Sequence, residues 1–536
     1  MTTTAIAERP FVYLFRTDNA KYAYDVNSGK VATLSDLNWA ILANWEKSDE
    51  DIARSPEGPF PVKDIERARS LIRDLGENGE IFSPKRPKAV KSPHTRESAA
   101  RKLSEECRQL ILCVSEACNL RCKYCYYTSG RDSERTHGSR LMSWETAEKA
   151  LAFFLARSYK TMEKYKAQQI ELKEGKEIRG SDVIPRPCVG FYGGEPLTNW
   201  PLMKRVIEFV RAQKDGKEYL INCTINGTLL TPAIMRFMAD NEISLNVSLD
   251  GPQDYHDRYR RFVDGSPSWD VVVSKLKYMQ ENMREYYDEN VHLLGVMAPP
   301  SDMRHLLDFV LTADFMPRRG IRFNGVDEDS SCFWSNLSAE DREISNGGLW
   351  DEYVEAAAQG KFITGYAPKE DRERRYLTFL RHMYNLMVSK AYNRTRYLYE
   401  GKSLVPDTVR NNFGMCLPGQ ERIFVTIDGR LLPCERLPSE APDLWIGDLD
   451  NGFDFDAVMK ICETNPALLE DKCVNCWNIR MCTVPCHELI DAEGRLSREA
   501  KLKACEGSKE ASHNSLWAMC TILEKNPRAL EFMDNM

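Results

Sequence analysis

Three cysteines, Cys118, Cys122 and Cys125, follow an apolar run that predicts a buried strand, and their spacing is C-x3-C-x2-C. Three thiolates can hold three irons of a four-iron cluster, which leaves the fourth iron open to a reacting molecule. Zinc is the alternative, but a structural zinc site is closed by four ligands. Cys113 lies inside the apolar run and the next histidine, His137, lies in a loop, so the sequence offers no evident fourth zinc ligand.

Six apolar runs alternate with helical stretches between residues 106 and 330. They lie near residues 109–115, 188–192, 219–224, 245–249, 291–296 and 320–324. Such alternation predicts a parallel sheet covered by helices, with the chemistry at the carboxyl ends of the strands. A charged segment from Lys160 to Asp182 is expected to be a solvated insertion, and residues 331–412 are expected to form a mostly helical bridging region.

Short motifs suited to ligand binding stand at the ends of three of these runs. Gly193-Gly194-Glu195-Pro196 follows the second run, and its glycines let the backbone approach a ligand that a Cβ atom would exclude. Thr224-Ile225-Asn226-Gly227-Thr228 ends the third run. Ser248-Leu249-Asp250-Gly251 ends the fourth run, and Arg260 lies shortly after it.

Together these residues resemble the cluster loop and ligand pocket of radical S-adenosylmethionine (SAM) enzymes. In that family the open iron chelates the amino and carboxylate groups of SAM, and an electron from the cluster cleaves SAM to a 5′-deoxyadenosyl radical. The resemblance implies an α/β fold for residues 106–330, a partial (β/α)6 barrel related to the eight-fold barrel. It also implies that Cys118, Cys122 and Cys125 are the catalytic cluster ligands.

The resemblance further assigns contacts with SAM. Gly193, Gly194, Glu195 and Pro196 match the GGEP motif, which contacts the SAM amino group. Asn226 belongs to the T-x-N-G-T segment that lines the pocket. Tyr124, directly before the third cysteine, is expected to lie along the adenine.

Polar residues after the fourth run complete the expected pocket. In the resemblance, Ser248 and Arg260 meet the ribose or the methionyl carboxylate, where a guanidinium forms a charge-assisted pair. The alternative for Arg260 is an ordinary helix-surface charge. His256 could act as a base, but a satisfied polar residue that caps a helix is favoured.

Length and composition limit the remaining possibilities. A chain of 536 residues is expected to form two to four domains. No stretch approaches the roughly 20 apolar residues of a membrane span, and the first residues form no signal-peptide core, so a cytoplasmic protein without a membrane partner is expected. Seventeen cysteines indicate metal rather than disulfides in that compartment, and the odd number excludes complete pairing. The net charge of −7, with both signs interspersed, gives no reason to expect nucleic acid.

Residues 1–82 read as a small domain in which strands precede helices. Apolar runs lie at 11–15, 22–24 and 31–34, one helix starts near Ser35, and a second places Ile65, Ala68, Leu71, Ile72 and Leu75 on one face. This order resembles the recognition element of ribosomally synthesised and post-translationally modified peptides (RiPPs). That element is a winged-helix domain, and it binds the leader peptide as an extra strand at a sheet edge. The alternative is another winged-helix module, including a DNA reader. Residues 83–105, rich in Pro, Lys, Arg and Ser, are expected to be a linker.

Seven cysteines and a glycine recur at fixed spacing within residues 413–536. They are Cys416-x12-Gly429-x4-Cys434, then Cys473-x2-Cys476-x5-Cys482-x3-Cys486, then Cys505. The pattern resembles the SPASM domain, which typically carries two auxiliary four-iron clusters. The resemblance implies one cluster on Cys473, Cys476, Cys482 and Cys505, and another on Cys416, Cys434 and Cys486. A paired zinc ribbon is the alternative.

The second of these sets has only three cysteines. Family members with a fully ligated cluster have an additional cysteine shortly before the position of Cys416, and residues 407–415 contain none. An open iron beside a peptide channel can accept the thiolate of a substrate cysteine, as proposed for thioether-forming relatives. The cysteines that match no motif are expected to be mostly small buried hydrophobes: Cys107, Cys113, Cys188, Cys223, Cys332, Cys462 and Cys520.

These resemblances imply a radical SAM/SPASM peptide maturase of the sactipeptide or ranthipeptide type, which joins a cysteine sulfur to a carbon of a cysteine-rich precursor peptide. The implied cofactors are SAM and three four-iron clusters, and the implied partners are the precursor peptide and an electron donor such as flavodoxin or ferredoxin. Carbon-carbon or carbon-oxygen crosslinking and formylglycine formation in a sulfatase are the enzymatic alternatives. A metal-dependent regulator that binds nucleic acid is the other alternative, and the six alternating units with GGEP disfavour it.

Overall fold

Six parallel strands form the centre of the protein. The structure is a computed structural model and describes residues 9–535 except 126, 128–135, 176–182, 327–332, 363–365, 367, 397–403 and 412–413. In spatial order the strands are β5 (Gln109–Ser115), β6 (Cys188–Gly193), β7 (Leu220–Ile225), β8 (Ser244–Ser248), β9 (Val291–Met297) and β11 (Ile321–Gly325). They coincide with the six apolar runs, so the expected parallel sheet is confirmed. Cys332 lies outside the described residues.

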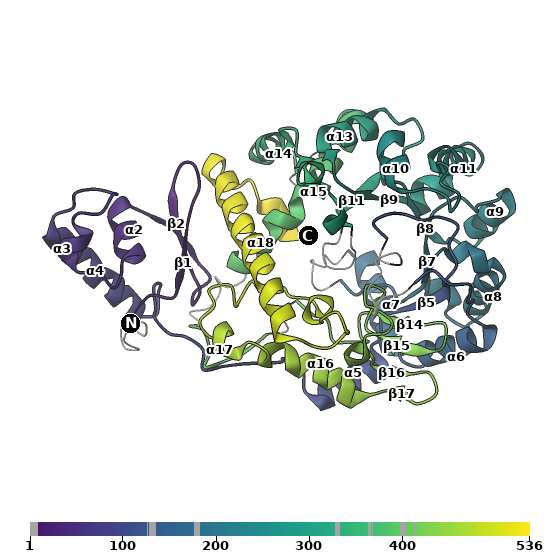
Figure 1. Ribbon diagram of the computed structural model, residues 1–536, viewed down its shortest axis with the longest axis horizontal. Coiled ribbons are helices and arrows are strands. Elements are labelled where there is room, and N and C mark those ends of the chain that lie inside the picture. The colour runs from purple at the N-terminus through teal and green to yellow at the C-terminus, as the bar shows by residue number, and fades with distance from the viewer. Residues whose placement is uncertain are drawn as a thin grey trace.

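Helices cover the outer side of this sheet (Figure 1). They are α6 (Trp144–Leu155), α8 (Trp200–Arg211), α9 (Pro232–Asp240), α10 (Gln253–Tyr259), α11 (Trp269–Asn282), α12 (Arg284–Asn290) and α13 (Met303–Thr312). In α8, Met203, Val206 and Val210 are buried and recur at helical spacing. Alternating strands and amphipathic helices therefore give the open α/β barrel its core.

The C-terminal region extends the same sheet. β14 (Ile423–Val425) lies parallel to β5, and β15 (Arg430–Leu432), β16 (Gly447–Asp448) and β17 (Gly452–Phe453) continue in antiparallel order. Beyond them lie α16 (Phe455–Ala467), α17 (Glu470–Cys473) and the long α18 (Arg498–Lys525). The region that carries the later cysteines is thus joined to the barrel by backbone hydrogen bonds.

The N-terminal region is a three-stranded antiparallel sheet followed by three helices. The strands are β1 (Val12–Arg16), β2 (Lys21–Asp25) and β3 (Val31–Leu34), and the helices are α2 (Asp36–Ala43), α3 (Asp49–Ile52) and α4 (Val62–Glu77). Ser35 caps α2 by accepting a hydrogen bond from Asn38 N at 3.2 Å. The face expected for α4 is partly wrong, because Leu71 is 58% exposed.

The two faces of this small sheet belong to different cores. Ala23 packs with the helices α2–α4, whereas Phe15 and Tyr24 belong to the core of the main body, as alternation along a strand requires. On the main-body face, Tyr13 stacks on Trp477 with ring centroids 3.7 Å apart. Figure 1 shows the hairpin of β1 and β2 beside α18. The N-terminal region is therefore docked on the C-terminal one.

The segment expected to be a linker is partly regular. β4 (Ala89–Lys91) pairs with β13 (Thr408–Arg410), and α5 (Arg96–Glu105) packs against α16. Ala99 and Leu103 are both 0% exposed and lie four residues apart on one face of α5. These two apolar residues, which stand among charged residues in the sequence, form the buried face of α5.

The expected insertion and bridging region are both helical in part. α7 (Tyr159–Lys173) buries Met162 but exposes Ile170 and Leu172. α14 (Leu349–Ala358) and α15 (Asp371–Arg396) pack against α18, and β10 (Ser301–Asp302) pairs with β12 (Ile344–Ser345). Within the described ranges, no helix combines the length and apolar character needed to cross a membrane.

Candidate cofactor site and the C-terminal cysteines

A cavity of about 290 Å³ lies at the carboxyl ends of the parallel strands. Its lining includes the expected residues Cys118, Cys122, Tyr124, Cys125, Gly193, Gly194, Glu195, Asn226, Ser248 and Arg260. Pro196 is buried directly after this group but does not line the cavity. Motifs that are far apart in the sequence therefore meet in one pocket, as strand ends of a parallel sheet do.

The two glycines of the GGEP motif also lie against the protein's own backbone. A Cβ atom on Gly193 would lie 2.2 Å from the Ser115 oxygen, and one on Gly194 would lie 2.5 Å from the Ala117 oxygen. Gly194 N donates to Ser115 O at 2.7 Å, and Glu195 N donates to Ala117 O at 2.8 Å. The glycines thus allow close approach of the protein's own backbone, at the segment that leads into Cys118.

The cysteine loop is also held from its other side. Arg121 N donates to Arg261 O at 2.8 Å, and Lys123 N donates to Tyr259 O at 3.1 Å. Val263 N donates to the oxygen of Asn119 at 3.2 Å. Backbone hydrogen bonds from two separate segments therefore fix the loop that carries the three thiols.

The side chain of Glu195 is buried in the cavity wall and links two backbone segments. Its Oε1 accepts from Leu197 N at 3.0 Å, and its Oε2 accepts from Asn226 N at 2.6 Å. Burial raises the pKa of Glu195 to about 7, although the two backbone donors oppose the shift. Glu195 thereby connects the turn after β6 to the end of β7.

Asn226 orients the cysteine loop through Asn119. Its Nδ2 donates to Asn119 Oδ1 at 2.8 Å, and its Oδ1 accepts from Thr228 N at 2.9 Å. Asn119 Nδ2 in turn donates to Thr228 Oγ1 at 2.8 Å. These bonds position the residue that directly follows Cys118.

Arg260 is a buried cation in the cavity wall and not a helix-surface charge. It is 8% exposed, its Nη1 donates to the Tyr124 hydroxyl at 2.9 Å, and it lies 4.0 Å from Asp250. The Tyr124 hydroxyl also bonds to Asp250. The Arg260 Nε is buried without a hydrogen-bond partner among the described residues, so the guanidinium keeps a donor for another group.

Two histidines near the site behave differently. His256 is 0% exposed and bonds to Asp250 N at 3.3 Å and to Ser268 Oγ at 3.0 Å, so it is a satisfied structural residue, as expected. Sequence reasoning missed His137, which lines the cavity. Neither ring nitrogen of His137 has a partner among the described residues, and burial lowers its pKa to about 4. The sequence signal for His137 was its position shortly after the three cysteines of the loop.

The thiols of the loop are protonated at neutral pH in the metal-free protein. Burial raises the pKa of Cys118 to about 11 and that of Cys125 to about 12. A metal would therefore displace protons on binding. Among the described residues, no three His, Cys, Asp or Glu side chains converge on a point where one metal ion could be shared. A four-iron cluster requires a different arrangement of thiolates, because each thiolate binds a separate iron.

The later cysteines form two groups in space. We call Cys473, Cys476, Cys482 and Cys505 the Cys473 group, and Cys416, Cys434 and Cys486 the Cys416 group. Burial raises the pKa of Cys482 to about 12, and the other members of the Cys473 group contribute to that shift. Burial also raises the pKa of Cys486, and Cys434 and Cys416 add to it. The members of each expected set are therefore electrostatic neighbours.

Cys462 is a further thiol beside the Cys416 group. It lies in α16 and is 3% exposed, and both burial and the neighbouring Cys416 raise its pKa to about 12. Asn465, one turn further along α16, donates to Val484 O at 3.5 Å, close to Cys486 in sequence. Sequence analysis grouped Cys462 with the unassigned buried cysteines because its spacing fits no motif.

Comparisons with known proteins agree with the geometry of the barrel. Residues 112–310 match the Radical SAM superfamily. The serine-type anaerobic sulfatase-maturating enzyme of Bacteroides thetaiotaomicron is 28% identical over 176 residues, 32% of this chain and 36% of that protein. The radical SAM cyclopropyl synthase TigE of Paramaledivibacter caminithermalis is 29% identical over 184 residues, 33% of this chain and 34% of that protein. The chain thus spans about a third of the length of these curated relatives.

Solved structures show similarity at lower sequence identity. Native anSMEcpe with bound AdoMet gives a TM-score of 0.45 at 17% identity, covering 80% of this chain and 100% of that chain. Streptococcus suis SuiB bound to precursor peptide SuiA gives a TM-score of 0.39 at 15% identity, covering 92% and 98%. The residues that match the Radical SAM superfamily, 112–310, include the cysteine loop and most of the residues that line the cavity.

Proposed function

We propose that this chain is a radical SAM enzyme that modifies a ribosomally made, cysteine-rich precursor peptide. The observation that carries the proposal is the meeting of three thiols, Cys118, Cys122 and Cys125, with the buried guanidinium of Arg260 in one cavity. The free Nε donor of Arg260 suits a ligand carboxylate, because a charge-assisted hydrogen bond compensates a buried cation. The three thiols suit a four-iron cluster with one open iron.

The cavity residues have separate tasks in this proposal. Bound there, the cluster and SAM supply a 5′-deoxyadenosyl radical at the barrel mouth. The three loop cysteines hold the iron, and the proposed SAM contacts are Tyr124, Gly193, Gly194, Glu195, Pro196, Asn226, Ser248 and Arg260. Glu195 and Asn226 keep the loop oriented through the bonds described above, so the pocket is preorganised before a ligand arrives.

The two C-terminal cysteine groups are proposed to hold auxiliary four-iron clusters, as a SPASM domain does. The N-terminal region is proposed to bind the leader of the precursor peptide at an edge of the sheet formed by β1, β2 and β3, as a recognition element does. Tyr13 of this region stacks on Trp477, which follows Cys476, so the region lies beside the Cys473 group. A flavodoxin- or ferredoxin-class protein is the proposed electron donor.

The proposed reaction forms a thioether. A hydrogen atom passes from a carbon of the peptide to the deoxyadenosyl radical, which yields 5′-deoxyadenosine. The peptide carbon then bonds to a cysteine sulfur that has lost its proton, and one electron leaves to an auxiliary site. The product is therefore two hydrogen atoms lighter for each thioether. Two other outcomes, a carbon-carbon or carbon-oxygen crosslink and formylglycine, use the same radical; the incomplete Cys416 group favours the thioether.

Anaerobic co-expression with a cysteine-rich peptide encoded beside the gene tests the proposal. We expect SAM-dependent formation of 5′-deoxyadenosine and loss of two hydrogens from the native peptide. A peptide with its core Cys changed to Ser should bind but keep its mass. Mass loss that persists in the Ser peptide would replace the thioether by another crosslink, and a new carbonyl group would support formylglycine. Absence of SAM cleavage in iron-loaded protein would reject the enzyme class itself.

A further inference from the structure

One histidine of the cavity has no task in the proposed function. His137 lines the cavity together with the three thiols of the cysteine loop. Both of its ring nitrogens are buried, and neither has a hydrogen-bond partner among the described residues. Because a buried donor or acceptor without a partner is costly, this ring is suited to a ligand that supplies the partners.

The backbone holds His137 at the end of β5. Glu116 N donates to Arg140 O at 3.0 Å, and Gly138 N donates to Glu116 O at 3.3 Å. The side chains also pair, since Arg140 Nε donates to Glu116 Oε2 at 3.0 Å. A Cβ atom on Gly138 would lie 2.5 Å from that oxygen, so the two segments approach closely. The position of His137 is therefore fixed relative to the segment that leads into Cys118.

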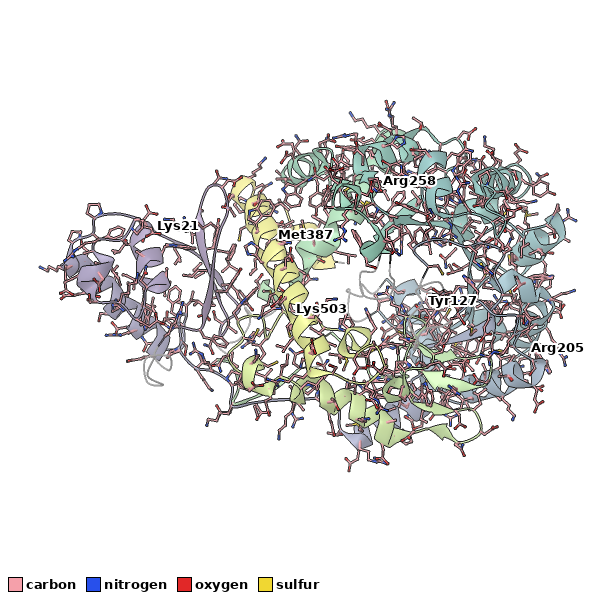
Figure 2. All side chains as sticks on the ribbon, viewed as in Figure 1. Lys21, Tyr127, Arg205, Arg258, Met387 and Lys503 are labelled. Atoms are coloured by element: carbon pink, nitrogen blue, oxygen red, sulfur yellow. The ribbon has the colours of Figure 1, made fainter. Side chains whose placement is uncertain are left out.

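Two tyrosines lie on the same side of the cavity as His137. The His137 ring stacks on the Tyr127 ring, with centroids 5.4 Å apart and an interplanar angle of 28°. Tyr127 is buried, and it lies inside the arc of outer helices (Figure 2). Its hydroxyl is 3.9 Å from Cys113 Sγ, and Cys113 is the neighbour of Tyr192 in the sheet. All three rings line the cavity, and we call Tyr127, His137 and Tyr192 the His137 wall.

The His137 ring is neutral at neutral pH. Burial lowers its pKa to about 4, Arg121 adds to the shift, and the backbone of Glu116 opposes it. A neutral imidazole has one N–H donor and one nitrogen acceptor. The His137 wall therefore combines a donor and an acceptor with two aromatic surfaces.

No member of the His137 wall is among the proposed SAM contacts. Arg260 bonds to Tyr124, whose hydroxyl bonds to Asp250. Asp250 Oδ1 accepts from Val296 N on β9 at 3.0 Å. The His137 wall lies instead at β5 and β6, and β7 and β8 lie between β6 and β9 in the sheet. The precursor peptide must bring a carbon to this cavity, and the proposed function has so far given it no contact there.

We propose that His137 hydrogen-bonds the backbone of the precursor peptide and holds the target carbon at the cavity. This inference rests on the proposed function, because it requires a peptide substrate and a radical formed from SAM. A peptide unit has one N–H donor and one carbonyl acceptor, so a bound segment can satisfy both nitrogens of a neutral imidazole. Tyr127 and Tyr192 offer ring surface to the neighbouring peptide side chains. Without His137 the radical still forms, but the target carbon is no longer held beside it.

Anaerobic turnover of the iron-loaded full chain with the precursor peptide encoded beside the gene tests the inference. In His137→Ala, the ratio of 5′-deoxyadenosine to modified peptide should rise about 10-fold, because two hydrogen bonds to the peptide are lost. His137→Gln should keep the ratio close to the parent value, since a side-chain amide also has a neutral donor and acceptor. His305→Ala is the matched control, because His305 is an exposed histidine on α13 that bonds to Asp254.

Two affinities measured without turnover separate a peptide contact from a SAM contact. Calorimetric titration should give the same SAM affinity for His137→Ala and the parent. Fluorescence anisotropy of the labelled precursor peptide, with SAM bound and no reductant, should show about 10-fold weaker binding to His137→Ala. The leader alone should bind both proteins equally, because the His137 wall lies in the barrel.

The possible results have distinct meanings. An unchanged product ratio and an unchanged peptide affinity in His137→Ala overturn the inference. A fall in SAM affinity in that variant also overturns it, because His137 would then be a SAM contact. Equal losses in His137→Ala and His137→Gln overturn it in favour of packing. A parent protein that cleaves SAM but leaves the mass of the peptide unchanged would instead reject the proposed peptide substrate itself.

Discussion

The cysteines at the barrel mouth and those of the Cys473 group lie on different kinds of elements. Cys118, Cys122 and Cys125 share one short loop, which backbone hydrogen bonds from two neighbouring segments hold in place. The Cys473 group instead has its members on α17, the loop after it and the first half of α18. A loop site of the first kind can lose its thiols without loss of fold, whereas the second kind is part of the packing between elements.

Removing the loop thiols should give the largest functional effect. We expect Cys118→Ala, Cys122→Ala and Cys125→Ala together to abolish SAM cleavage and to lower iron from about 12 to about 8 atoms per chain. The melting temperature of the metal-free protein should change little, since these side chains lie at a cavity. Iron analysis, 5′-deoxyadenosine formation and calorimetry measure the three quantities. Equal destabilisation by the loop variant and by alanine at all four members of the Cys473 group would remove the contrast between the sites.

Gly194→Ala should disable the loop by displacing the backbone before Cys118. The added Cβ would lie 2.5 Å from Ala117 O and 2.7 Å from Glu116 O, so the segment before Cys118 must move. A displacement of that kind costs about 100-fold in rate when it misplaces a reacting group. Gly325→Ala is the matched control, because Gly325 lines the same cavity and its added Cβ would meet nothing within 4 Å. Similar rates of SAM cleavage in the Gly194→Ala and Gly325→Ala variants would show that the loop tolerates the shift.

The sequence predicted the elements that local pattern determines. Each of the six parallel strands appears at one of the apolar runs, because buried strands have local signatures. The close approach of the two glycines to the oxygens of Ser115 and Ala117 was not readable, since those oxygens belong to another segment. Pairing of β14 with β5 was equally hidden, because a strand of three residues that pairs with a distant part of the chain has no local signal. The burial of Lys501, which is 0% exposed on α18, was not predicted either, because lysine is almost never fully buried.

Arg260→Met tests the cavity itself. We expect SAM to bind about 10- to 100-fold more weakly, because a charge-assisted hydrogen bond contributes about 1.5–3 kcal/mol. Arg261→Met is the control, since the Arg261 side chain bonds to Gly265 O away from the cavity. Calorimetric titration of iron-loaded protein measures both affinities, and the melting temperature reports the cost of leaving Asp250 without its cation. Unchanged affinity in a folded Arg260→Met protein would remove Arg260 from the proposed SAM contacts.

The smallest expected effect concerns the interface between the N-terminal region and the segment that follows Cys476. Tyr13 stacks on Trp477, and its hydroxyl bonds to His513 Nδ1 at 3.0 Å. Tyr13→Phe keeps the ring and removes that bond, so the free energy of opening β1–β3 should fall by about 0.5–1.5 kcal/mol. Hydrogen exchange measures it, and Tyr366→Phe, which removes an exposed hydroxyl bond to Glu373, should leave it unchanged. Because Trp477 follows Cys476, Tyr13→Phe should also speed iron release from the Cys473 group to chelators, while the barrel-mouth site keeps its rate. Equal acceleration at both sites would show that the N-terminal region stabilises the whole chain and not this group in particular.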